Sequence, residues 1–228
     1  MSEHRLEVFD DLEAVHRRGA ELIAEATRAA VGERGSCGLA VSGGRDPWPM
    51  FSQLEDLIED WTKVAIYQVD ERVAAPGSDE RNLTHLIESL SIGAQGSIKP
   101  MPVNDDDLEA AADRYAEQLP DGPLDIAHLG IGPDGHTASL VPGDPVLEVT
   151  DKRVAVTSGE YQGVRRMTLT YPEINRIRKL LWVVTGEEKV DALKKLIAQD
   201  PSTPSGAMRP EGESVILADR AAAPDAGD

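Results

Sequence analysis

Cysteine is almost absent from this chain of 228 residues, which holds only Cys37. A single thiol excludes an internal disulfide framework and any metal site built from several cysteines. Long hydrophobic runs are lacking too, because no apolar stretch in the sequence reaches the length that spans a bilayer. The first residues, MSEHRLEVFDD, are acidic and unlike a signal peptide. We therefore expect a cytoplasmic protein that is not held in a membrane.

Positive charge is also scarce. Lysine and arginine total 23 residues against 41 aspartates and glutamates, which gives a net charge of −18 at pH 7. Such a surface repels phosphate backbones and anionic lipids, so we expect neither a nucleic-acid partner nor a membrane partner. If the chain binds a small anion, it must gather its few cations in one pocket. The positions of those cations are therefore informative.

The composition is otherwise that of an ordinary globular protein. Hydrophobic residues make up 40% of the chain, which is enough for a sizeable core at this length. Because no internal repeat or long linker divides the sequence, we expect a single domain over residues 1–228. From about Ala221 the chain is expected to form a frayed tail.

Short apolar runs of the strand type follow one another along the chain. They cover residues 37–41, 64–69, 125–131 and 180–185, with shorter candidates at 154–156, 167–170 and 214–217. Helical patterns separate them, over residues 12–31, 47–58, 81–91, 105–119, 172–178 and 187–199, whereas 93–104 looks irregular. Continuous apolar strands that alternate with helices are typical of a mainly parallel sheet. We therefore predict a three-layer, Rossmann-like α/β fold with helices on both faces of the sheet.

Four loops that follow predicted strands are rich in glycine or charge. They span residues 42–47, 70–72, 132–139 and 185–189. In parallel sheets, ligands bind outside the carboxyl ends of the strands. We therefore expect these four loops to converge on one site.

The first of these loops begins Ser42-Gly43-Gly44, between a predicted strand and a predicted helix. Two glycines allow backbone N–H groups to turn toward one point, and the start of the next helix favours an anion. Gly43 and Gly44 can thus cradle a phosphate, with Ser42 as a further donor. An ordinary tight turn explains the same residues, and the spacing fits neither a P-loop nor a dinucleotide fingerprint.

A histidine stands on the rigid turn Gly132-Pro133-Asp134-Gly135-His136, directly after a predicted strand. A histidine in such a place is a candidate general base, and Asp134 lies close enough in sequence to orient its ring. The alternative is a surface histidine whose neighbouring aspartate only caps the turn.

Charged residues close two of the other strands. In Asp70-Glu71-Arg72, either carboxylate can act as an acid or base and Arg72 can bind an oxyanion, although a solvated ion pair explains the same pattern. Lys189 stands in the first turn after Thr185-Gly186, where it can point to a ligand or pair with nearby glutamates. Arg166 is a further cation in a chain that has few.

Other catalytic patterns are missing from the sequence. There is no Gly-x-Ser-x-Gly motif, which leaves little support for a serine-hydrolase triad. No cluster of histidine and carboxylate ligands has metal-site spacing, and Cys37 lies within an apolar strand, where it is expected in the core.

Residues 125–143 read DIAHLGIGPDGHTASLVPG. This segment resembles the 6-phosphogluconolactonase family, in which a hydrophobic strand precedes GPDGHTASLFPG, and Val141 stands where phenylalanine is usual. The resemblance continues over nearly the whole chain, through Ser42-Gly43-Gly44 with Pro47, Asp70-Glu71-Arg72 with Asn82, Arg166-Met167-Thr168-Leu169-Thr170 with Pro172 and Asn175, Thr185-Gly186-Glu187-Glu188-Lys189, and residues 215–222.

The resemblance implies hydrolysis of 6-phospho-D-glucono-1,5-lactone to 6-phosphogluconate in the pentose phosphate pathway, with no metal and no organic cofactor. It implies catalytic roles for His136, Asp134 and Arg72, with His136 as the base that activates water. Arg72 would hold either the phosphate or the developing oxyanion. The phosphate-binding positions matched by the resemblance are Ser42, Gly43, Gly44 and Lys189, and we add Arg45 and Arg166 to them. The expected partner is a small sugar-phosphate lactone, bound by a monomer or small homo-oligomer.

Two alternatives remain. Glucosamine-6-phosphate deaminases share the fold, but their loop resembles VDGHIAFNEPG, with a glutamate at the place of Val141. The other alternative is a non-catalytic sugar-phosphate sensor, because the first loop reads Arg45-Asp46 where the family has small hydroxyl residues. Arg45 is expected to add a charged contact to the anionic end of the substrate.

Overall fold

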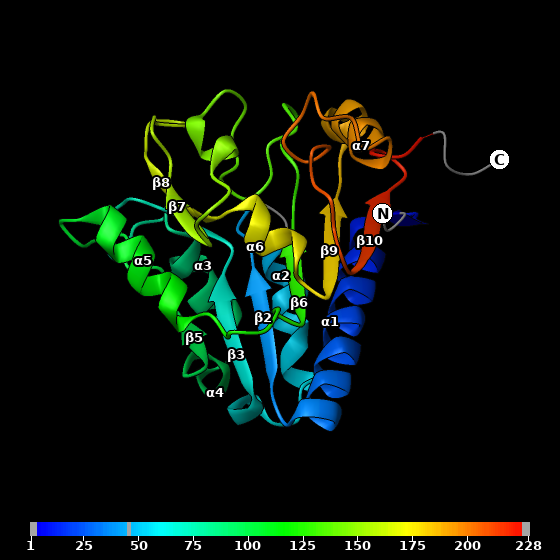
Figure 1. Ribbon diagram of the computed structural model, residues 1–228. Helices are drawn as coiled ribbons and strands as arrows, with labels where there is room; N and C mark the ends of the chain where they lie inside the picture. Colours follow the sequence, from blue (N-terminus) through cyan, green and yellow to red (C-terminus); the bar gives the residue numbers. More distant parts are fainter. Residues whose placement is uncertain (1–3, 45–46, 225–228) are drawn as a thin grey trace.

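A seven-stranded parallel sheet forms the centre of the computed structural model, which describes residues 4–44 and 47–224 (Figure 1). The strand order is β1-β10-β9-β6-β2-β3-β5, and every neighbouring pair in it is parallel. The strands of this sheet are β1 (His4–Phe9), β2 (Cys37–Val41), β3 (Val64–Gln68), β5 (Ile98–Lys99), β6 (Ile126–Leu129), β9 (Lys179–Val184) and β10 (Glu213–Asp219).

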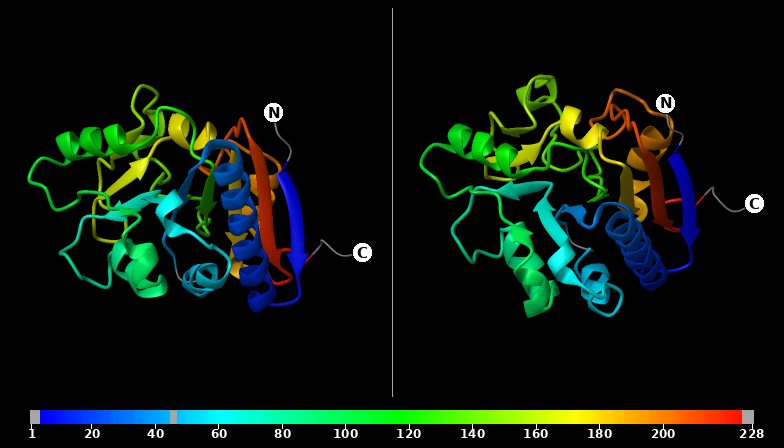
Figure 2. Two further views of the ribbon diagram at one scale, coloured as in Figure 1. Left: turned by 90° about the horizontal axis from the view of Figure 1, so that it is seen from below. Right: turned by 60° about the horizontal axis from the view of Figure 1, so that its bottom comes forward.

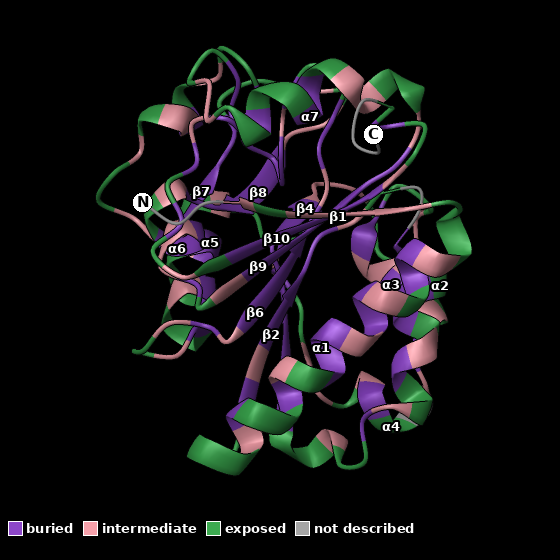
Figure 3. Ribbon diagram, turned by 90° about the vertical axis from the view of Figure 1, so that its right-hand side faces the viewer, coloured by how far each residue is buried: buried purple, intermediate pink, exposed green. Residues whose placement is uncertain are grey.

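Helices cover both faces of the sheet, as the sequence predicts (Figure 2). One face packs against α1 (Leu12–Arg34), α2 (Trp48–Ser52), α3 (Asn82–Ser89) and α4 (Ile92–Gln95). The other packs against α5 (Leu108–Gln118), α6 (Tyr171–Asn175) and α7 (Val190–Ile197). Successive strand residues alternate between the two cores: in β9, Leu180 and Trp182 belong to one and Leu181 to the other. The sheet is therefore apolar on both faces, and Figure 3 shows its strands buried through the middle of the molecule.

The long helix α1 shows how local signals set the element boundaries. The Asp11 carboxylate accepts a hydrogen bond from the backbone N–H of Ala14 at 2.8 Å, which caps the first turn. Gly35 ends the helix in a left-handed conformation with φ of 81°, where glycine carries no Cβ penalty. An apolar stripe that includes Val15, Leu22 and Ile23 is buried against the sheet.

A second, smaller sheet stands beyond the carboxyl end of β3 (Figure 1). It is antiparallel, with the order β4-β8-β7, and its strands are β4 (Asp70–Arg72), β7 (Val154–Val156) and β8 (Arg166–Leu169). Val69 joins the two sheets, since its N–H donates to Val41 O and its carbonyl accepts from Leu169 N–H, both at 2.8 Å. The charged segment 70–72, read from the sequence as a strand-end loop, is thus a strand of this sheet.

Short 3-10 helices complete the connections, at Gln53–Asp56, Trp61–Lys63, Pro145–Glu148 and Glu187–Lys189. The helix expected over residues 47–58 is accordingly shorter, because it ends at Ser52 and continues as a 3-10 turn. The region 93–104, expected to be irregular, contains part of α4 and the short strand β5. Strand β1 was not predicted, because Arg5 and Glu7 interrupt its apolar residues at the edge of the sheet.

The expectation of a frayed tail from Ala221 is wrong for residues 221–224. Ala222 and Ala223 are buried, and they belong to the core that packs against α7. Their N–H groups bond to Asp219, Ala222 to its carboxylate at 2.8 Å and Ala223 to its carbonyl at 3.0 Å. Three successive alanines show no alternation of apolar and polar residues, so this local anchoring was not visible in the sequence. Within the described part of the chain, none of the helices has the length and apolar character that a membrane crossing needs.

Candidate active site

The strand-end loops predicted to converge do so around one cavity of about 530 Å³. Each of the four loops contributes lining residues, among them Gly43, Arg72, His136 and Lys189. The parallel sheet explains this placement, because β2, β3, β6 and β9 are adjacent and end at the same edge. Arg45 lies outside the described residues.

The first loop is held by contacts that require its glycines. A Cβ on Gly43 would overlap the side chain of Asn82, and Gly44 adopts φ of 143°, a backbone conformation that side chains other than glycine's rarely adopt. Asn82 is itself anchored, because its side-chain amide donates to the carbonyl of Asp70 at 3.0 Å. The loop therefore brings bare backbone to the wall of the cavity.

A buried carboxylate ties this loop to the histidine loop. Asp70 accepts hydrogen bonds from the hydroxyls of Ser42, at 2.9 Å, and Ser139, at 2.7 Å. Ser42 lines the cavity, but its hydroxyl proton is committed to Asp70. The two loops, nearly a hundred residues apart in sequence, are thus fixed to each other through one side chain.

Glu71, which the sequence left as a possible acid or base, has a structural place. It is fully buried and does not line the cavity. Its carboxylate accepts from the backbone N–H groups of Asn82, at 2.8 Å, and Leu83, at 2.9 Å, at the start of α3. Arg81 pairs with it at 3.0 Å. Glu71 therefore caps helix α3 and positions Asn82 rather than facing a ligand.

His136 stands on the turn after β6 and lines the cavity. Its Nδ1 lies 2.6 Å from Asp134 Oδ1, which also accepts the backbone N–H of His136 at 3.1 Å. Partial burial by itself raises the pKa of Asp134, but the hydrogen bonds from His136 and Tyr161 outweigh it and lower this pKa. Asp134 therefore remains a carboxylate that accepts a proton-bearing Nδ1, which leaves Nε2 as the basic nitrogen of the ring.

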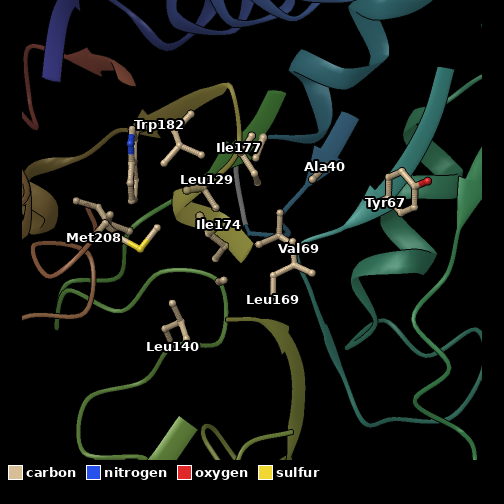
Figure 4. Close-up of a cluster of buried hydrophobic side chains, with 14 of the residues drawn as sticks. Ala40, Tyr67, Val69, Leu129, Leu140, Leu169, Ile174, Ile177, Trp182 and Met208 are labelled. Atoms are coloured by element: carbon tan, nitrogen blue, oxygen red, sulfur yellow. The ribbon is translucent and has the colours of Figure 1, made fainter. Parts of the chain in front are cut away.

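The turn is shaped for this contact. A Cβ on Gly132 would occupy the space of the His136 ring and the Asp134 carboxylate. Gly135 has φ of 81° and packs closely against Thr203. Leu140, four residues after His136, is fully buried in the core between the two sheets, near Leu169 and Met208 (Figure 4). The loop is thus anchored by its apolar end while its polar end faces the cavity.

Two arginines face each other across the small sheet. Arg72 of β4 and Arg166 of β8 are partners in the antiparallel register, and both line the cavity. Burial lowers the pKa of Arg166, the carboxylate of Asp70 opposes this, and the positive charge of Arg72 lowers the pKa further. Like charges directly opposite each other in a sheet are destabilising, so an anion in the cavity would relieve this pair.

These guanidinium groups are only partly satisfied by the protein. Arg166 donates to Tyr161 O at 3.2 Å and Gln162 Oε1 at 3.1 Å, and Arg72 donates to Glu80 O at 2.9 Å. Among the described residues, the buried Nε atoms of Arg72 and Arg166 meet no hydrogen-bond acceptor. Unsatisfied buried donors of this kind favour binding of an oxyanion.

Lys189 reaches the cavity from the loop after β9. The loop begins at Gly186, whose φ of 94° turns the chain and whose N–H donates to the Asp219 carboxylate at 3.1 Å. Glu188 lines the cavity as well, so the loop contributes both signs of charge. The cavity therefore has cationic groups on two sides, Lys189 on one strand-end loop and the arginine pair on the small sheet.

His128, in the middle of β6, also lines the cavity. Burial lowers its pKa to about 4, despite a hydrogen bond with the backbone of Ser42 that raises it. A neutral ring at this position packs edge-on to Phe51, with 5.2 Å between the ring centroids. His128 therefore supports the first loop and adds no charge to the site.

Sequence reasoning missed Tyr161 and Gln162. They stand on a tight turn, in which Tyr161 and Val164 form an antiparallel bridge and Gln162 and Gly163 have positive φ. The sequence feature that indicates this turn is Gly163, which stands in a polar stretch between two short predicted strands. It predicts a hairpin but not the position of that hairpin against His136. Among the described residues, no group of histidine, cysteine and carboxylate side chains is arranged to hold a metal ion.

The sequence profile shared by glucosamine-6-phosphate isomerases and 6-phosphogluconolactonase matches residues 10–217. This chain belongs to that family. It is 32% identical to a 6-phosphogluconolactonase of Nostoc sp., with 95% of this chain and 96% of the relative covered. The 6-phosphogluconolactonase of Mycobacterium tuberculosis is 33% identical, with 96% of both chains covered.

Solved structures show the same family fold. A 6-phosphogluconolactonase from Shewanella baltica superposes with a TM-score of 0.86 at 27% identity, over 95% of this chain and 98% of that one. A monomeric glucosamine-6-phosphate deaminase has a TM-score of 0.83 at 20% identity, over 96% of this chain and 99% of that one, which shows likeness of fold alone. Since both activities occur on this fold, the choice between them depends on the site.

Proposed function

We propose that this chain hydrolyses 6-phospho-D-glucono-1,5-lactone to 6-phospho-D-gluconate, a step of the pentose phosphate pathway. The observation that carries the proposal is the His136–Asp134 pair, which lines the same cavity as the cations Arg72, Arg166 and Lys189. A lactone with a phosphate group needs such a base and such anion-binding groups together. The names of the Nostoc and Mycobacterium relatives support the same activity.

In the proposed mechanism, neutral His136 accepts a proton from water through Nε2 as the water oxygen attacks the lactone carbonyl. The bond from the carbonyl carbon to the ring oxygen then breaks, and the imidazolium returns its proton to that oxygen, which leaves as a hydroxyl. Asp134 holds the proton on Nδ1 and stabilises the imidazolium that forms. No metal or organic cofactor takes part in this proposal.

The anionic groups of substrate and intermediate would be bound by two parts of the cavity. Backbone N–H groups of Gly43 and Gly44, with Lys189, are proposed to bind the phosphate, and Ser42, whose hydroxyl donates to Asp70, is proposed to position this loop. Arg72 and Arg166 form the other cationic part, which would bind the phosphate or the tetrahedral oxyanion. Comparison of phosphorylated and unphosphorylated gluconolactone separates these two roles of the arginines.

The deaminase alternative needs an acid that this chain lacks at the corresponding place. Position 141 is valine, its side chain is buried, and it does not line the cavity. The decisive experiment measures hydrolysis of both gluconolactones, with the spontaneous rate subtracted, and ammonia release from glucosamine 6-phosphate. Faster hydrolysis of the phosphorylated lactone supports the proposal. Ammonia release supports the deaminase, and thermal stabilisation by sugar phosphates without either reaction supports a sensor.

Lys189→Ala is expected to raise KM for the phosphorylated lactone about ten- to a hundredfold, because one charge-assisted hydrogen bond to the phosphate is lost. The value of kcat should change much less, since His136 and Asp134 are untouched. Steady-state kinetics measure both constants. Lys195→Ala, an exposed change on α7, the helix that follows Lys189, is the matched control and should leave KM unchanged. A loss confined to kcat in Lys189→Ala would contradict phosphate binding.

We further propose that the protein is a single domain acting in the cytoplasm as a monomer or small homo-oligomer, without nucleic-acid or membrane partners. The net charge of −18 supports the exclusion of polyanionic partners. Light scattering of the purified chain measures the oligomeric state directly.

A further inference from the structure

The tight turn 161–164 places an aromatic side chain against the proposed base. The Tyr161 hydroxyl donates to Asp134 Oδ2 at 3.0 Å and lies 3.2 Å from His136 Nδ1. The His136 and Tyr161 rings meet at an interplanar angle of 61°, with centroids 5.1 Å apart. Tyr161 therefore contacts both members of the pair from a segment 25 residues further along the chain.

The contact completes the hydrogen bonding of Asp134. One oxygen, Oδ1, takes both bonds from His136, through Nδ1 and the backbone N–H. The other oxygen, Oδ2, takes the bond from Tyr161. With both oxygens engaged, the carboxylate cannot rotate away from Nδ1 without losing a second partner.

We propose that Tyr161 is a positioning residue for the reaction: it locks Asp134 in the orientation that keeps the proton on His136 Nδ1 and presents Nε2 to the attacking water. The inference rests on the proposed function, in which His136 is the base. Partial burial and the bond to Asp134 raise the pKa of the Tyr161 phenol, so at neutral pH it remains a donor.

Tyr161 also contacts the anion-binding side of the cavity. The Arg166 guanidinium lies over the Tyr161 ring, 5.1 Å from its centroid, and it donates to the Tyr161 carbonyl at 3.2 Å. The ring and the hydroxyl thus serve different neighbours. Removing the hydroxyl alone affects the base, whereas removing the ring also disturbs Arg166.

Several charged groups line the same cavity as His136. A change in the titration of His136 that is caused by Tyr161 must therefore be distinguished from the effects of these groups. Besides Asp134 on its own loop and Tyr161 on the facing turn, the charged or titratable side chains that line the cavity in the described part of the chain are Asp70, Arg72, His128, Arg166, Glu188 and Lys189. Tyr161→Phe changes none of these charges. A change in the titration of His136 in this variant therefore reports the lost hydrogen bond.

The test compares wild type, Tyr161→Phe and Tyr161→Ala, with Tyr171→Phe as the matched control. The Tyr171 hydroxyl bonds to Pro204 O at 2.9 Å and does not line the cavity. For Tyr161→Phe we expect kcat to fall about three- to tenfold with KM nearly unchanged, the effect of one lost hydrogen bond. Tyr161→Ala should lower kcat similarly and also raise KM, because Arg166 loses its aromatic neighbour.

The pH dependence of kcat/KM is a measurement that a purely structural role of Tyr161 would leave unchanged. Without the Tyr161 donor, Asp134 bears more uncompensated negative charge, which favours the protonated form of His136. The acid limb of kcat/KM should therefore move to higher pH in Tyr161→Phe. The ¹⁵N NMR titration of His136 in the ligand-free protein should move in the same direction, and it needs no turnover.

The outcomes test the positioning role of Tyr161 and the proposed lactonase activity separately. Unchanged kcat and an unchanged His136 titration in folded Tyr161→Phe would overturn the positioning role while leaving the lactonase proposal intact. A loss of kcat without any shift in either titration would also overturn it, because it would indicate packing alone. If wild type hydrolyses no lactone, the proposed function fails, and the NMR titration still determines whether Tyr161 controls His136.

Discussion

His136→Ala is expected to lower kcat for the phosphorylated lactone about a hundred- to ten-thousandfold, the range that a positioned general base contributes. The reason lies in the geometry, since His136 is the histidine whose ring bonds to a carboxylate at 2.6 Å while it lines the cavity. Substrate binding should persist, because the cations of the site are untouched. Stopped or continuous assays at saturating substrate, with spontaneous hydrolysis subtracted, measure the loss.

The matched control for this variant is His85→Ala. His85 is on α3, bonds to the carbonyl of Asp79 at 2.8 Å and does not line the cavity. Its removal should leave kcat within about twofold of wild type, as expected for a substitution away from the site. Full activity in His136→Ala would exclude this histidine as the base. Equal losses in both variants would point to general damage to the fold.

Gly132→Ala is expected to lower kcat about a hundredfold, because displacing a reacting group by about 1 Å has effects of this size. The added Cβ would occupy the space of the His136 ring and the Asp134 carboxylate, so the pair must move. KM should change little, since Arg72, Arg166 and Lys189 come from other elements. Steady-state kinetics together with the melting temperature distinguish a displaced base from an unfolded chain.

Gly122→Ala is the control for the glycine substitution. A Cβ at Gly122 would meet no atom within 4 Å, and its backbone is not in the left-handed region. This variant should match wild type in kcat and in melting temperature. If Gly132→Ala kept the kcat of wild type, the close fit between the turn and the His136 ring would have no bearing on turnover.

The sequence by itself determined the class of the fold and the edge at which the site lies. Apolar runs such as 37–41 and 180–185 match β2 and β9 closely, because burial on both faces leaves a continuous hydrophobic signal. The turn at 132–136 was also readable, since glycine and proline at fixed positions restrict the backbone locally. The convergence of the four loops follows from the parallel topology and is confirmed by the cavity.

The tertiary structure decided the roles within each motif. Asp70 and Glu71 are neighbours of the same type, yet one joins two serines at the cavity and the other caps α3. Arg72 stands opposite Arg166 only because β4 and β8 pair in a given register. Likewise, Tyr161 meets His136 through a turn whose direction no local pattern specifies. Local sequence records burial and backbone preference, whereas contacts between distant loops depend on strand order and register, which form only when the whole chain packs.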